Sequence, residues 1–393
     1  MPRVGILTLH LHVNYGGILQ AAALYRLLED EGFEPVLLRK EPENRGWVGR
    51  SIRNLLRAIP GQNVGGVRAR AKAREVHQPF IRRFLPNTSP PCHNGEELRA
   101  AVDQRQLDAV VVGSDQVWRP EYHQDSNHSV YFLDFVPAGV RKLSYAASFG
   151  HSDWRYPEMR EEASGLLAEF DAVSVREASG VDICRHKLGR QQCELVLDPT
   201  LVVDPVLYEE AAAPPAAKTR PSLVSYVLDQ SQRSRAVRRG VEAALPDSFE
   251  TTSLSVGWER SQVGVGQWLR AFMDADFVIT DSYHGTIFSI LFGKNFIALG
   301  NKDRGLDRFT TLLQSLDLMD RLVLDHDPST ISSLVSQPID YGRVSERLMA
   351  LRKTSRRYLR SALEQAPDRL VAPTNGGIFF QLTRRPHVSY ASC

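Results

Sequence analysis

The chain has 393 residues, of which 42% are hydrophobic and 24% charged, and its 48 Lys and Arg against 46 Asp and Glu leave a formal charge of +2. This length favours two domains, and this composition excludes a disordered or fibrous chain. The small net charge argues against a dedicated nucleic-acid-binding protein, which would carry a clear excess of basic residues.

Strand and helix patterns alternate through the first half of the chain. Apolar, β-rich runs occur at residues 4–9, 33–38, 107–113, 142–148, 171–175 and 194–197. Helical periodicity occurs between them, at residues 17–30 and 158–169. Apolar strands that alternate with amphipathic helices are typical of a parallel sheet covered on both faces. We therefore predict an N-terminal α/β domain over residues 1–204.

The composition changes at residues 205–221, where an Ala- and Pro-rich run is typical of a linker. The alternation then restarts, with strands expected at 223–228, 251–256, 277–280 and 295–299 and helices at 233–244, 265–275 and 285–291. This pattern predicts a second α/β domain over 222–340, a long helix over 341–365 and a tail over 366–393. Two Rossmann-like parallel-sheet domains would bind ligands in the cleft at the carboxyl ends of their strands.

A basic segment, residues 40–85, interrupts the first domain. Within it four apolar residues share one helical face and three arginines the other: Ile52, Leu55, Leu56 and Ile59, and Arg50, Arg53 and Arg57. Such a helix either packs on its own domain or lies on an anionic membrane surface. Peripheral membrane association is therefore one hypothesis, although no apolar run is long enough to span a bilayer.

The N-terminus and the cysteines indicate an intracellular protein. The chain begins as a core strand and not as a signal peptide. Its cysteines form no CxxC pair, and their sparseness predicts free thiols in a reducing compartment: Cys92, Cys184, Cys193 and Cys393.

The most informative segment is 275–288, where a buried strand ends and an apolar helix begins within a few residues. Asp281 or Ser282 is the expected N-cap, followed by Tyr283, His284 and Gly285. The free amides and positive dipole end of a helix N-terminus attract an anion, and His284 would supply a proton beside it. The alternative is a structural histidine.

Cationic side chains follow two other strands. Lys302, Arg304 and Arg308 come directly after the strand at 295–299 and either clamp a phosphate or carboxylate or remain a solvated loop. Arg176 follows the strand at 171–175 and is either an anion ligand or the partner of Glu177. For both the three cations after residue 299 and the single arginine after residue 175, one of the two alternatives is binding of an anionic substrate.

The third strand ends in a polar turn, and the first leads into paired glycines. Asp115 is a candidate base for a hydroxyl, and Trp118 either stacks on a sugar or lies in the core. Ser114 belongs to the same candidate site, unless it or Asp115 caps a helix. Asn14, Gly16 and Gly17 permit close backbone approach to a ligand.

His10 and His12 would lie on one strand face, but no carboxylate or cysteine accompanies them at ligand spacing. The sequence therefore predicts no metal site. The chain also lacks a P-loop, a GxGxxG fingerprint and a GxSxG elbow.

Five motifs occur in a characteristic order: Asn14-Tyr15-Gly16-Gly17-x-Leu19-Gln20, Gly113-Ser114-Asp115-Gln116-Val117-Trp118, Ser174-Val175-Arg176-Glu177, Asp198-Pro199-Thr200 and Asp281-Ser282-Tyr283-His284-Gly285-Thr286. This ordered set, spanning about residues 4–320, resembles the polysaccharide pyruvyl transferase family. The resemblance implies a GT-B-like fold and transfer of the enolpyruvyl group of phosphoenolpyruvate to sugar hydroxyls, without a cofactor.

The resemblance assigns Arg176 and His284 to phosphoenolpyruvate, with His284 as general acid. Some members carry an arginine where this chain has Ser282, a charge that Arg304 or Lys302 would replace. Two other functions stay open: a glycosyltransferase with a nucleotide-sugar donor, and a non-catalytic glycan-binding protein.

Overall fold

The fold is that of a computed structural model, which describes residues 1–12, 14–42, 65–123, 128–215, 217–254, 263–300, 305–325 and 327–364 and, within 65–74, the backbone alone. The basic helix expected at residues 50–59 and the tail expected at 366–393 lie outside the described residues, as do Lys302 and Arg304.

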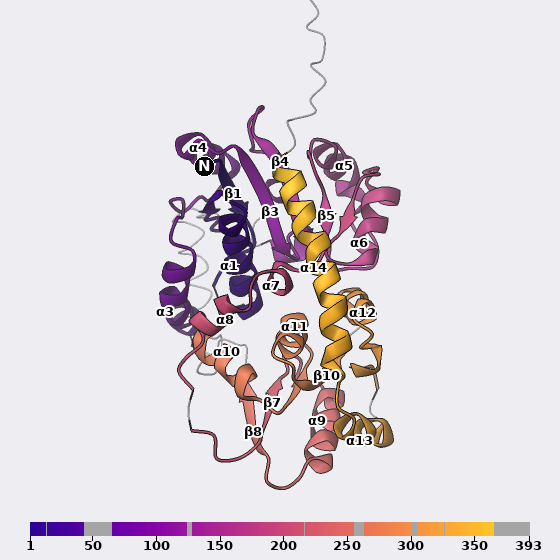
Figure 1. The fold of residues 1–393 in the computed structure, drawn as a ribbon. Helices are drawn as coiled ribbons and strands as arrows, with labels where there is room; N and C mark the ends of the chain where they lie inside the picture. The colour runs from indigo at the N-terminus through magenta and orange to yellow at the C-terminus, as the bar shows by residue number, and fades with distance from the viewer. Residues whose placement is uncertain are drawn as a thin grey trace, which may run out of the picture.

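The first half of the chain forms a six-stranded parallel sheet (Figure 1). Its strands are, in spatial order, β2 (Glu34–Leu38), β1 (Arg3–Leu7), β3 (Ala109–Asp115), β4 (Arg141–Ala147), β5 (Ser174–Val175) and β6 (Glu194–Leu195). The helices of this half are α1 (Tyr15–Asp30), α3 (Gly65–Phe84), α4 (Gly95–Arg105), α5 (Arg160–Ala168) and α6 (Ala178–Asp182). Every residue of β3 and β4 is buried, which explains the apolar run Ala109–Val112 of β3.

The second half forms a five-stranded parallel sheet, in the order β11 (Leu322–Val323), β10 (Asn295–Leu299), β9 (Phe277–Thr280), β7 (Ser222–Tyr226) and β8 (Glu250–Leu254). Its helices are α9 (Gln232–Ala244), α10 (Val265–Asp274), α11 (Tyr283–Leu291), α12 (Leu306–Ser315) and α13 (Pro328–Ser336). Two short helices, α7 (Pro199–Val202) and α8 (Val206–Ala211), connect the halves, so part of the expected linker is helical.

Short turns complete the described part of the chain. They are 3₁₀ turns at Pro120–Tyr122, Ser129–Phe132, Pro157–Met159 and Met319–Arg321 and a π turn at Ile183–Lys187.

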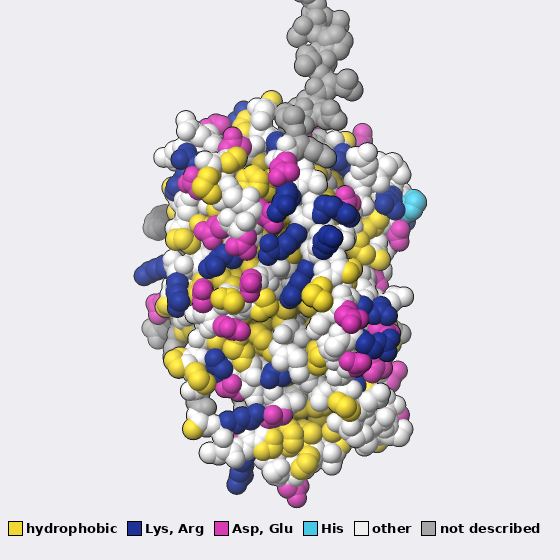
Figure 2. All heavy atoms as spheres, viewed as in Figure 1, with side chains coloured by type: hydrophobic (Ala, Val, Ile, Leu, Met, Phe, Trp, Pro, Cys, Tyr) yellow, Lys and Arg dark blue, Asp and Glu magenta, His cyan; other side chains and the backbone are white. Residues whose placement is uncertain are grey.

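A long helix, α14 (Tyr341–Glu364), crosses from the second half back to the first (Figure 1). At its start the Tyr341 hydroxyl donates to the carbonyl of Lys294, 2.5 Å away. Near its end the Tyr358 hydroxyl donates to the carbonyl of Ser144 on β4, 2.9 Å away. Lys and Arg side chains gather along its outer face (Figure 2), and Arg360 pairs with Glu31 at the end of α1. The helix therefore fastens the two sheets to each other.

The two sheets also share one hydrophobic core. Tyr15 at the start of α1 stacks on Trp268 of α10 at 5.4 Å between ring centroids, and both side chains are fully buried. Two parallel sheets with a returning C-terminal helix form a GT-B-like α/β fold, which confirms the predicted fold class. The domain boundaries remain a prediction.

Among the described helices, none combines the length and the hydropathy needed to cross a membrane. Cys92, Cys184 and Cys193 are buried free thiols.

Candidate active site

The candidate site is centred on one carboxylate oxygen, Oδ2 of Asp198, between the two sheets. The Ser114 hydroxyl at the end of β3 donates to it at 2.7 Å, and Nη1 of Arg176 after β5 donates at 2.8 Å. From the second sheet, Nε2 of His284 lies 3.6 Å from the same oxygen. Residues far apart in sequence, and predicted separately as ligands, therefore converge on one acceptor atom.

Asp198 takes this place because it is the N-cap of α7. Its Oδ1 accepts hydrogen bonds from the amide and the hydroxyl of Thr200, at 3.1 and 2.6 Å, and Pro199 occupies the first turn. Burial alone would raise the pKa of Asp198, but the neighbouring His284 and Arg176 outweigh burial and hold that pKa well below its ordinary value. The centre of the site is thus an ionised carboxylate.

The Arg176 side chain is fully enclosed, with 0% of its surface exposed. It also pairs with Oδ1 of Asp115 at 3.5 Å and, more loosely, with Glu177 at 3.9 Å. Burial would lower the pKa of Arg176, but the charges of Asp198 and Asp115 raise it above its ordinary value. Its Nε and Nη2 nevertheless have no hydrogen-bond partner among the described residues, so this guanidinium retains two buried donors.

A second guanidinium, that of Arg308, also lies near the Tyr283 ring. The Cζ atom of Arg176 is 4.8 Å from the centroid of the Tyr283 ring, and that of Arg308 is 5.4 Å away. Burial and the charge of Arg176 lower the pKa of Arg308, and burial raises the pKa of the Tyr283 hydroxyl. Burial also raises the pKa of Glu177, and the neighbouring charge of Arg176 acts in the opposite direction.

His284 reaches the site from the first turn of α11. Ser282 is the N-cap, as predicted: its Oγ accepts from the amide of Gly285 at 3.3 Å. Asp281 instead accepts from the amides of Leu228 and Asp229, at 2.6 and 2.7 Å. A Cβ on Gly285 would lie 2.2 Å from the Thr280 hydroxyl, so this glycine lets α11 pack against β9.

The paired glycines at the start of α1 approach side chains of other elements. A Cβ on Gly16 would lie 2.0 Å from Nδ1 of His284, and a Cβ on Gly17 would lie 3.3 Å from Oδ2 of Asp115. Asn14 caps α1, its side chain accepting from the amide of Gly16 at 3.1 Å. The backbone of Gly16 therefore lies close to the imidazole of His284, which belongs to α11 in the second half of the chain.

Asp115 ends β3 in an unusual backbone conformation, with φ of 110°. Non-glycine residues rarely adopt this region, and such strain costs about 1–3 kcal/mol and clusters at functional sites. Its Oδ1 accepts from the amide of Gln116 at 2.8 Å. Since β3 runs through Ser114 and Asp115 and no helix follows directly, neither residue is a helix cap.

Trp118 is enclosed, with 1% of its surface exposed. Its indole stacks on Phe132 at 5.5 Å and donates to the carbonyl of Tyr131 at 3.0 Å. This environment matches the core alternative and not a sugar-stacking platform.

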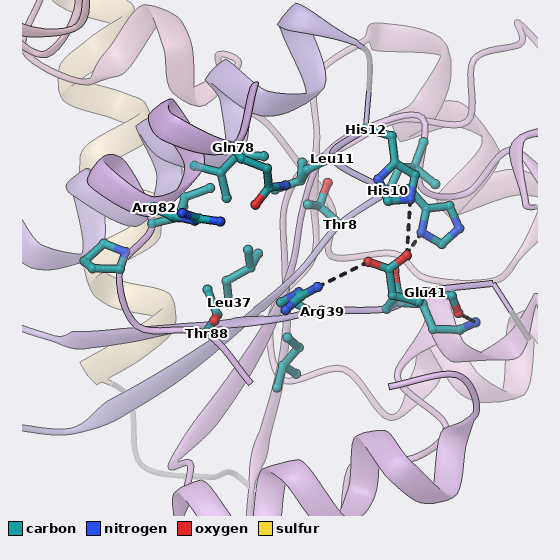
Figure 3. A pocket seen from close by; sticks show the side chains of 16 residues that line it. Thr8, His10, Leu11, His12, Leu37, Arg39, Glu41, Gln78, Arg82 and Thr88 are labelled. Atoms are coloured by element: carbon teal, nitrogen blue, oxygen red, sulfur yellow. Dashed lines mark hydrogen bonds and ion pairs between the residues drawn. The ribbon is translucent and has the colours of Figure 1, made fainter. Parts of the chain in front are cut away.

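A cavity of about 530 Å³ lies at the carboxyl ends of β1 and β2, beside the cluster of side chains around Asp198 (Figure 3). His10 and His12 meet Glu41 at its rim, and their ligand atoms all lie within 4.8 Å of one another. Burial lowers the pKa of His10, with a further contribution from His12. Sequence reasoning found no carboxylate for the two histidines because Glu41 lies on the neighbouring chain segment, after β2.

The sequence analysis also did not select Asp198 as a site residue. The available signal was an Asp-Pro-Thr motif directly after a strand, which predicts an N-cap at the edge where ligands bind.

Fold and site together define a GT-B-like α/β protein with a buried acid–base cluster between two parallel sheets. The chain belongs to the polysaccharide pyruvyl transferase family, whose family model matches residues 14–303. This is a family of enzymes, and it implies a sugar or polysaccharide substrate.

Solved structures similar to this chain include S. aureus MnaA with UDP, with a TM-score of 0.47, 10% identity and coverage of 88% of this chain and 90% of that chain. UDP-GlcNAc 2-epimerase from Neisseria meningitidis bound to UDP-GlcNAc matches with a TM-score of 0.47 and 10% identity, over 93% of this chain and 98% of that chain. The Streptomyces sp. SF2575 glycosyltransferase SsfS6, complexed with thymidine diphosphate, matches with a TM-score of 0.44 and 14% identity, over 93% of this chain and 100% of that chain. Among curated proteins none matches the sequence. Family membership therefore rests on the family model.

Proposed function

We propose that the protein transfers the enolpyruvyl group of phosphoenolpyruvate to two hydroxyls of a sugar in a polysaccharide or glycolipid precursor, forming a pyruvate ketal and releasing phosphate. The observation that supports this most strongly is the convergence of Arg176 and His284, from opposite sheets, on one oxygen of Asp198. The Arg176 guanidinium, which would bind the donor, and the His284 imidazole, which would supply the proton, thus lie side by side at the same carboxylate oxygen.

Phosphoenolpyruvate carries a phosphate and a carboxylate, which require fixed donors and cations. Arg176 offers two buried N–H donors that form no hydrogen bond within the described residues, and Arg308 adds a second guanidinium 5.4 Å from the centroid of the Tyr283 ring. Lys302 and Arg304 belong to the same proposed set, as do Ser282, Tyr283 and Gly285 of the α11 N-terminus. These groups would hold the donor with its methylene carbon towards His284.

The reaction then needs one acid and one base. Protonated His284 gives its proton to the methylene carbon, which leaves a cationic centre at C2. A sugar hydroxyl forms a C–O bond to C2 and loses its proton to Asp115. The C2–O bond to phosphate then breaks, the second hydroxyl forms a C–O bond to C2, and its proton passes to the neutral His284. Asp115 gives its proton to the departing phosphate, so that the ketal and inorganic phosphate are the products and both residues are restored.

The acceptor would enter through the 530 Å³ cavity. Its wall includes Thr8, whose hydroxyl donates to the carbonyl of Ser114 at 3.3 Å, so the cavity adjoins the β3 end that carries Asp115. Because Arg176 is 0% and His284 8% exposed, binding of the donor requires a local opening of the structure around these two side chains. The buried free thiols fit a reducing compartment, and we place the reaction in the cytoplasm, at the membrane if the acceptor is lipid-linked.

Incubation with phosphoenolpyruvate and pooled glycan precursors tests this function. We expect a glycan whose mass has increased by one pyruvate ketal, together with one phosphate per ketal, by mass spectrometry and phosphate assay. Glycosyl transfer from a nucleotide sugar instead would identify a glycosyltransferase. Glycan binding without turnover of either donor would identify a non-catalytic protein.

Replacing Gly16 by Ala tests the contact between the sheets. The added methyl would lie 2.0 Å from Nδ1 of His284, so the imidazole must leave its present position beside Asp198. We expect pyruvyl transfer to fall about 100-fold, since a misplacement of about 1 Å costs that much. Gly165→Ala in α5, where a Cβ meets nothing within 4 Å, is the control and should leave the rate unchanged. Equal rates for both variants would show that His284 does not act from this position.

A further inference from the structure

The strongest feature that the proposed reaction does not use is the group formed by His10, His12 and Glu41. It is the one group of three potential metal ligands found in the described part of the chain. The two imidazole rings stack at 5.5 Å with an interplanar angle of 6°, and both turn towards the Glu41 carboxylate (Figure 3). Two histidines and a glutamate form a ligand set that Zn²⁺ and similar divalent ions occupy in proteins.

The spacing of the ligand atoms is close to that of a metal site. Tetrahedral ligands about 2.0–2.1 Å from an ion lie about 3.4 Å from one another. Nε2 of His12 and Oε2 of Glu41 are already 3.2 Å apart. No pair in the group exceeds 4.8 Å, so small movements of the half-buried His12 and Glu41 side chains towards His10 would bring the three ligand atoms to this spacing.

The orientation of His10 is fixed by a second contact. Its Nδ1 lies 2.7 Å from the carbonyl oxygen of Lys40, which can only accept, so Nδ1 carries the proton. The lone pair of His10 is therefore on Nε2. A backbone carbonyl on the distal nitrogen is the arrangement that orients metal-binding histidines.

The group opens onto the 530 Å³ cavity, whose lining includes all three residues. Water or a bound ligand in that cavity would complete the coordination of an ion held by three protein atoms. Nearby cations oppose binding: the Lys40 ammonium donates to the backbone carbonyl of Glu41 at 3.0 Å, and Nη2 of Arg39 lies 3.6 Å from Oε1 of Glu41. Of the two, Arg39 pairs with the Glu41 carboxylate itself. It contacts the oxygen that does not face His12, so Oε2 remains directed towards the group.

We propose that His10, His12 and Glu41 bind one divalent cation of the Zn²⁺ class at the rim of the cavity. This assignment is independent of the proposed reaction, because it concerns binding by residues outside the Asp198 cluster.

The test uses the untagged full-length chain, stripped with a chelator and dialysed. Zn²⁺ is titrated in competition with a chromophoric chelator, and bound metal is counted by mass spectrometry. We expect one Zn²⁺ per chain. His12→Ala and Glu41→Gln should each weaken binding at least 100-fold, because removing even a partner outside the coordination sphere costs about 10–100-fold. Arg39→Gln should tighten binding, since it removes a repelling charge.

The matched control is His93→Ala. His93 and Glu97 form a pair of the same residue types, with Nδ1 and Oε2 3.0 Å apart, but without a second imidazole. This variant should bind Zn²⁺ like the unaltered chain. The proposal is overturned if the unaltered chain binds no stoichiometric Zn²⁺, or if Glu41→Gln and His12→Ala, shown to be folded by circular dichroism, bind it undiminished.

Discussion

Replacing His284 by Gln is expected to lower the turnover of phosphoenolpyruvate at least 100-fold while the protein stays folded. The imidazole is the one proton donor from the second sheet that faces the Asp198 carboxylate, at 3.6 Å, among the residues described here. General acid catalysis contributes about 10²–10⁴-fold to a rate, and the glutamine amide cannot release a proton in the physiological range. The measurement is kcat for phosphate release with a sugar acceptor.

The control for this variant is His186→Gln, an exposed histidine on the π turn of the first half. Its turnover should equal that of the unaltered protein. Thermal unfolding should be alike in all three proteins within a few degrees. If His284→Gln retained more than about one third of the activity, the proton would have to come from another group, and the assignment of the acid would be wrong.

The fold was predictable because the central strands β3, β4 and β9 are buried on both faces. Runs such as Val110-Val111-Val112 have no polar position that a one-sided sheet would require, and every residue of that strand is buried. The cap at Ser282 followed from local chemistry, since its side chain accepts from the amide three residues on. Local signals of this kind identify where strands end and helices begin. The residues of the candidate site lie at such positions, for example Asp115 at the end of β3 and His284 in the first turn of α11.

The convergence on Asp198 was not predictable, because it depends on how the two sheets face each other. Spacing along the chain cannot show that a cap of α7, a strand-end arginine and a first-turn histidine meet at one oxygen. The same holds for Glu41, which the parallel pairing of β1 with β2 brings beside the histidines. Trp118 stayed ambiguous because a tryptophan after a strand serves a core and a sugar site equally well.

Replacing Asp198 by Asn is expected to destabilise the protein by about 3 kcal/mol, the lower end of the cost of removing one partner of a buried ion pair. Arg176, whose side chain is 0% exposed, loses its nearest counter-charge and keeps only the more distant Asp115 and Glu177. Chemical denaturation at pH 7 measures the loss. Asp153→Asn is the matched control: Asp153 pairs with Lys187 at 3.0 Å on the surface and should cost about 0–1 kcal/mol.

The pH dependence of this difference distinguishes an ionised Asp198 from a neutral one. The pKa of Asp198 in the folded protein lies below its ordinary value of 3.8, so the unfolded chain takes up the proton first as the pH falls. The stability contributed by the charge is therefore complete above about pH 5 and declines below about pH 4. The gap between the unaltered protein and Asp198→Asn should narrow over that acidic range. A gap that widened on acidification would mean that Asp198 is protonated in the native protein, and Arg176 would then lack the counter-charge on which the site depends.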